Sequence, residues 1–72
     1  MRQKDYSKLR GRIVEYFGTQ GAFAEAVGNK VNTMSYKLRG SSVISVKDIE
    51  QWCEIIEIPT KDIGLYFFTY KV

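Results

Sequence analysis

The chain has 72 residues, of which 44% are apolar and 26% charged, with a single proline. A chain of this length holds one hydrophobic core, so we expect one domain over residues 1–72 and exclude a two-domain enzyme. With no histidine and one cysteine, Cys53, it lacks the parts of a Cys/His zinc site, a disulfide framework or a histidine acid–base pair. We therefore expect no metal, no cofactor, no small-molecule substrate and no enzymatic activity.

The net charge of +3 is unevenly placed along the chain. Residues 1–40 hold eight Lys/Arg against three Asp/Glu, or +5, whereas residues 41–72 hold three against five, or −2. This polarity suits two different partners. No stretch approaches the roughly 18 to 20 apolar residues of a membrane helix, and the N-terminus lacks the apolar segment of a signal peptide. We expect a soluble, intracellular protein that contacts no membrane.

A first helix is predicted over Tyr6–Phe17, capped by Asp5 or Ser7 and ended by Gly18. Its apolar residues recur at helical spacing: Tyr6, Leu9, Ile13, Tyr16 and Phe17. Thr19 then caps a short second helix, which Gly28 ends. A third helix is predicted over Val31–Arg39 and ends at Gly40.

The fourth helix has the clearest pattern in the chain. Ser45 and Asp48 form a capping-box start. The apolar stripe that follows is Ile49, Trp52, Cys53 and Ile56. Pro59 breaks this helix, Thr60 begins one last helical turn, and residues 67–72 are predicted to be extended. We expect an all-α fold of four to five short helices with a short extended C-terminal tail.

The spacing between Gln20 and Gly40 is that of a helix-turn-helix. Ala24 is small where two helices cross, Gly28 makes the turn, and the pair Met34 and Leu38 anchors the third helix. The opposite face then carries candidate base-reading residues, Asn32, Ser35, Tyr36 and Arg39, with candidate phosphate contacts Lys30, Lys37 and Arg12. Gln20, at the start of the second helix, completes the DNA-binding set. The alternative is that these are ordinary solvated side chains.

Three segments extend this pattern beyond the motif: DYSKLRGRIVEYFGTQ, TMSYKLRG and IGLYFFTYKV. Through them the chain resembles the small helix-turn-helix regulators of temperate phages, in the lambda-repressor and Cro-like superfamily. It is more specifically similar to the modulator-of-repression antirepressors of lactococcal phages. The resemblance implies a five-helix fold, no enzymatic activity, a cytoplasmic location in the bacterial host and a role in the choice between lysogeny and lysis, with a CI-type repressor as partner.

Lys30 and Val31 depart from the pattern of many of these relatives, which have small polar residues there. A lysine side chain cannot cap a helix, and valine cannot hydrogen-bond to a base edge. This departure disfavours DNA reading by the third helix.

An acidic surface on the fourth helix is the second candidate site. Glu50, Glu54 and Glu57 are predicted to share the face opposite the apolar stripe, with Asp48 beside them. Such a row is commonly a solvated helix face, but it also fits the basic DNA-reading surface of a repressor. The resemblance leads us to rank an antirepressor that binds the N-terminal domain of a CI-type repressor above a Cro-like dimer that binds operator DNA directly.

Two apolar features remain. The C-terminal segment concentrates five large side chains, Leu65, Tyr66, Phe67, Phe68 and Tyr70. We expect them to fold back over the core, with an intermolecular contact as the alternative. Cys53 is predicted to be a buried core thiol.

Overall fold

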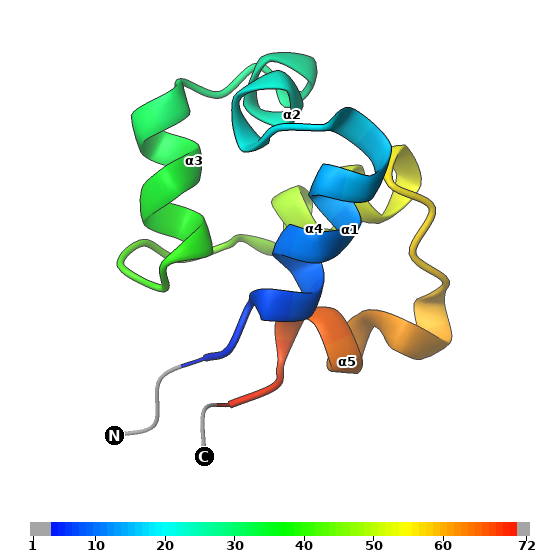
Figure 1. Ribbon diagram of the computed structural model, residues 1–72. Helices are drawn as coiled ribbons and strands as arrows, with labels where there is room; N and C mark the ends of the chain where they lie inside the picture. The colour runs from blue at the N-terminus through cyan, green and yellow to red at the C-terminus, as the bar shows by residue number, and fades with distance from the viewer. Residues whose placement is uncertain (1–3, 71–72) are drawn as a thin grey trace.

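A computed structural model describes residues 4–70, which form five α-helices arranged about the first (Figure 1). The helices are α1 (Ser7–Phe17), α2 (Gln20–Val27), α3 (Val31–Leu38), α4 (Val46–Ile55) and α5 (Ile63–Phe67), and a 3-10 turn, η1 (Thr60–Asp62), leads into α5. The all-α prediction is confirmed. Residues 71–72 of the predicted tail and residues 1–3 of the predicted domain lie outside the described part.

At the starts of α1, α2 and α4, side chains accept hydrogen bonds from the first backbone N–H groups. Asp5 accepts a hydrogen bond from the Ser7 N–H at 2.9 Å, and Thr19 Oγ1 accepts one from the Ala22 N–H at 3.1 Å. At α4 both halves of the predicted capping box form between Ser45 and Asp48. These hydrogen bonds replace the ones that water would otherwise make to backbone N–H groups, which have no acceptor inside the first helical turn.

The helices α2, α3 and α4 each end with a residue in the left-handed backbone conformation. A backbone hydrogen bond after that residue spans the last helical turn. Gly28 and Gly40 take φ of +79° and +83° after α2 and α3, as predicted. At α4 the residue is Glu57, with φ of +53°, and the Ile58 N–H donates to the Cys53 carbonyl at 2.9 Å. This is a Schellman ending. The expectation that α4 continues to Pro59 was wrong, because the helix ends at Ile55.

Glu57→Gly is expected to raise the free energy of unfolding by about 0.5–1 kcal/mol. Glycine adopts the left-handed conformation without the steric cost that a side chain imposes there. Thermal unfolding followed by circular dichroism measures the gain against Glu57→Ala, which removes the same carboxylate and keeps the strain. Equal midpoints for the two variants would contradict the strain argument.

All five helices contribute buried side chains to the core, including the predicted pair Met34 and Leu38 of α3, and an aromatic cluster lies within it. Phe23 is in contact with Trp52, with ring centres 5.3 Å apart, and Trp52 lies 6.2 Å from Phe67. Leu9 and Ile13 of α1 are fully buried beneath them. Cys53 is only partly buried, which corrects the prediction of a core thiol, and the burial it has raises the pKa of the thiol.

The two ends of the described part, at residues 4–5 and 69–70, lie side by side (Figure 1). Lys4 pairs with Tyr70 in an isolated antiparallel bridge, and the Asp5 N–H donates to the Thr69 carbonyl at 2.6 Å. The predicted extended segment is wrong at Phe67, which ends α5 and is buried.

The expected folding of the tail over the core therefore holds for only part of it. Phe67 is buried and Tyr66 packs against the core, whereas Leu65, Phe68 and Tyr70 stay exposed. Helical spacing explains the division within α5, because successive residues of one turn cannot all face the core.

Candidate functional site

The outer side of α4 carries two of the predicted acidic residues. Glu50 and Glu54 lie four residues apart in the helix and are exposed, whereas Trp52 faces inward and is fully buried. Within residues 4–70 neither carboxylate takes part in an ion pair. Both charges are therefore available to a cationic partner.

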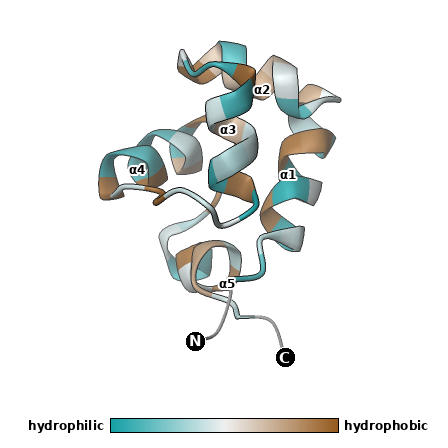
Figure 2. Cartoon of the chain, turned by 90° about the vertical axis from the view of Figure 1, so that its left-hand side faces the viewer, coloured by the Kyte–Doolittle hydropathy of each residue, from teal (hydrophilic) through white to brown (hydrophobic). Residues whose placement is uncertain are grey.

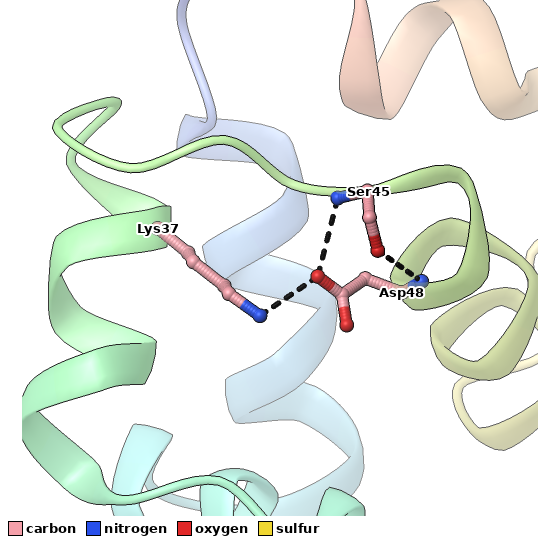
Figure 3. A network of polar contacts seen from close by, with 3 residues as sticks. All are labelled: Lys37, Ser45 and Asp48. Carbon is pink, nitrogen blue, oxygen red and sulfur yellow. Dashed lines mark hydrogen bonds and ion pairs between the residues drawn. The ribbon is translucent and has the colours of Figure 1, made fainter.

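Asp48 differs from these glutamates because its carboxylate is engaged within the chain (Figure 3). Oδ2 accepts hydrogen bonds from Lys37 Nζ at 2.7 Å and from the Ser45 N–H at 3.2 Å. Partial burial by itself raises the pKa of Asp48, but the bonds from Lys37 and Ser45 outweigh it and hold the pKa below its usual value. Asp48 thus ties the end of α3 to the start of α4.

Asp48→Asn is expected to lower the free energy of unfolding by about 1 kcal/mol at pH 7, because it removes the charge that pairs with Lys37. A carboxyl whose folded-state pKa is depressed contributes its full stability above pH ~4 and loses it as the pH falls through that pKa. The gap between the two proteins should therefore shrink in acid. Urea unfolding at pH 7 and pH 3 measures this gap in the free energy of unfolding. Glu25→Gln, at an exposed position of α2, is the control. An equal gap at both pH values would contradict this role.

Glu57 lies outside the helical row to which the sequence assigned it. Since α4 ends at Ile55 and Glu57 turns left-handed, only Glu50 and Glu54 share the helix, and the predicted row of three is wrong. Interaction with the Glu57 carboxylate raises the pKa of the Tyr16 phenol, so the two side chains lie close to each other. The exposed Glu57 side chain thus lies at the junction of α1 with the end of α4.

The outward side of α3 and its two ends display half of the eight predicted DNA-contacting residues. The exposed members are Lys30, Asn32, Tyr36 and Arg39. The Arg39 guanidinium lies 5.1 Å from the centre of the Tyr36 ring. Gln20 and Ser35 are half-buried, and Lys37 is the partner of Asp48. The face is less cationic than the sequence suggested, because Lys37 is bound to Asp48.

Arg12, predicted as a phosphate contact, is instead engaged at the end of α4. Its Nε donates to the Ile56 carbonyl at 2.9 Å and its Nη2 to the Glu57 carbonyl at 2.7 Å. Arg10 makes the equivalent contact at α3, where Nη1 donates to the Leu38 carbonyl at 3.0 Å. Both arginines of α1 therefore satisfy carbonyl groups that the helix ends leave unpaired.

Two exposed apolar residues next to the acidic side chains were missed by the sequence analysis. Val43 in the loop before α4 and Val46 in its first turn are 84% and 70% exposed. The sequence holds no clear signal for Val46, because it lies three residues before Ile49 and so matches the helical spacing of the buried stripe, whereas Val43 precedes the helix. Val46 lies one helical turn before Glu50, and Val43 lies three residues before Val46.

Metal and membrane features were searched over the same part of the chain. No group of three or more Asp, Glu, Cys or His residues between positions 4 and 70 could hold a metal ion. None of the helices described there is long and apolar enough to cross a bilayer.

Comparison with known proteins finds a family and a solved structure that the chain matches over most of its length. A family model described as a protein of unknown function, DUF739, matches residues 3–70. The solution structure of the modulator of repression (MOR) of the temperate bacteriophage TP901-1 from Lactococcus lactis is 38% identical to the chain. The match covers 92% of this chain and 89% of that one, with a TM-score of 0.81. No curated protein sequence matches.

Proposed function

The chain belongs to the DUF739 family and to the family of the phage modulator of repression, and from this premise we propose that it is an antirepressor. In this role it binds the DNA-reading helix-turn-helix domain of a cognate CI-type repressor and blocks operator binding, which favours lysis over lysogeny. It acts as a binding protein without enzymatic activity, in the cytoplasm of the bacterial host where repressor and operator are found.

The observation that carries the mechanism is the free acidic face of α4. Glu50 and Glu54 are exposed and have no ion-pair partner within residues 4–70. A repressor contacts DNA phosphates with Lys and Arg, so its reading surface is cationic and complementary to this face. Complementary charge speeds encounter and selects the partner. Glu57 extends the proposed contact set at the end of α4, whereas Asp48 is bound by Lys37 and contributes by fixing the start of that helix.

Charge reversal on α4 tests this mechanism. Glu50→Lys with Glu54→Lys is expected to weaken binding to the purified N-terminal domain of the cognate repressor at least 100-fold, because two attractions become repulsions. Isothermal titration calorimetry measures the affinity.

The matched control is Glu15→Lys with Glu25→Lys, which makes the same charge change at exposed positions of α1 and α2. This control should bind within about threefold of the unchanged protein. Equal binding by the α4 double variant would remove the acidic face from the mechanism.

The second candidate function is a Cro-like repressor that binds operator DNA directly as a dimer. Exposed Asn32, Tyr36 and Arg39 on α3 favour it, because such groups can reach base edges. Against it, Lys37 and Arg12 are engaged within the chain.

A gel shift on operator DNA separates the two functions. An antirepressor alone gives no specific band and removes the band of the repressor. A Cro-like protein gives its own band, and its affinity falls with a log–log salt slope of about −0.9 per phosphate contacted.

A further inference from the structure

Val43 and Val46 are the two most exposed large apolar side chains among residues 4–70. In Figure 2 the loop that enters α4 and the first turn of that helix carry the brown of apolar residues on the outside of the molecule. The described part of the chain places nothing over either side chain. Isolated exposed apolar residues are common on proteins, so their meaning depends on how they are held and on what adjoins them.

The junction that carries both valines is fixed before any partner arrives. Ser45, which lies between them, caps α4 through its hydroxyl, and its N–H is bound by the Asp48 carboxylate. Lys37 of α3 binds the same carboxylate at 2.7 Å and so joins the junction to the preceding helix, as Figure 3 shows. A surface that is already ordered loses little conformational entropy on binding.

Charge adjoins these apolar side chains on one side. Val46, Glu50 and Glu54 follow one another at intervals of four residues, so they lie along one exposed face of α4. An apolar centre flanked by carboxylates suits a partner that presents Lys and Arg. The aliphatic stems of such side chains pack on apolar surface while their charged ends reach the carboxylates.

We propose that Val43 and Val46 form the apolar centre of the surface on which the basic DNA-reading helix of the repressor docks, with Glu50 and Glu54 as its charged rim. This inference rests on the proposed function and deepens it. The charges steer and select the partner, whereas the two valines supply the apolar area whose burial slows dissociation.

Truncation of the two valines tests the proposal. Val43→Ser with Val46→Ser is expected to weaken binding to the repressor N-terminal domain at least tenfold, which corresponds to about 1.4 kcal/mol. Surface plasmon resonance at 0.1 and 0.3 M salt should show that the dissociation rate rises while the salt dependence of association stays unchanged. Charge reversal at Glu50 should change that salt dependence instead.

The matched control is Val14→Ser with Val31→Ser, which truncates exposed valines on α1 and α3. It should bind as the unchanged protein does, and circular dichroism establishes that both double variants are folded. If the unchanged protein binds and Val43→Ser with Val46→Ser binds equally well, the proposal is overturned and the proposed function stands.

Failure of the unchanged protein to bind the repressor domain overturns the proposed function and the docking surface with it. Sedimentation velocity tests the alternative that a second copy of this chain occupies the same surface. Self-association that Val43→Ser with Val46→Ser abolishes would assign the surface to a homodimer and overturn the proposal.

Discussion

Trp52→Ala is expected to lower the free energy of unfolding by about 3–5 kcal/mol. The indole is fully buried and lies between Phe23 and Phe67, so its removal leaves a cavity where α2, α4 and α5 meet. A domain of this size has a total stability of roughly 4–11 kcal/mol, at about 0.05–0.15 kcal/mol per residue. The variant should therefore lose about a quarter or more of the total stability, and urea unfolding followed by circular dichroism measures the loss.

Trp52→Phe is the informative companion of this variant. It keeps an aromatic ring against Phe23 and removes an indole N–H that is buried without an acceptor among residues 4–70. A buried donor without a partner costs about 1–3 kcal/mol, so its removal offsets part of the lost packing. We expect a net loss below about 2 kcal/mol. A loss as large as that of Trp52→Ala would show that the N–H has a partner in the folded protein.

Arg12→Ala is expected to destabilise the fold by about 2 kcal/mol, which lowers the thermal midpoint by roughly 8–16 °C for a domain of this length. The guanidinium donates to the carbonyls of Ile56 and Glu57 at the end of α4, and a charged donor to a partly buried carbonyl is worth more than a neutral one. Differential scanning calorimetry gives the midpoint and the enthalpy together.

Two controls define the source of this effect. Lys8→Ala removes a positive charge from an exposed position of the same helix and should change stability by less than about 0.5 kcal/mol. Arg12→Lys keeps the charge but cannot donate in the same forked geometry, so about half of the loss should remain. Full stability in Arg12→Lys would mean that charge alone, and not the paired hydrogen bonds, holds the end of α4.

Much of the fold was predictable because its signals are local. The caps at Thr19 and Ser45 and the glycine endings at positions 28 and 40 each depend on residues within one helical turn. The apolar stripe around Trp52 follows from helical spacing alone. The end of α4 was mispredicted because Glu57 takes a conformation that a glutamate rarely adopts, and its carbonyl is bound by Arg12 from a distant part of the chain.

The candidate site was less predictable than the fold. Sequence alone placed four carboxylates on one acidic surface, but it could not show that Asp48 is bound by Lys37 or that Glu57 lies beside Tyr16. It likewise assigned Lys37 and Arg12 to DNA phosphates, whereas both are engaged within the protein. Which charges remain for a partner depends on which ones the folded chain uses itself.

The sequence by itself determined where helices begin, which faces they bury and how charge divides between the two halves of the chain. Only the tertiary structure decided that Glu50 and Glu54 remain without an ion pair within residues 4–70, and that Val43 and Val46 are exposed at the start of the same helix. The reason is physical. Helix spacing and capping depend on neighbours within four residues, whereas exposure and ion pairing depend on contacts between segments that only folding brings together.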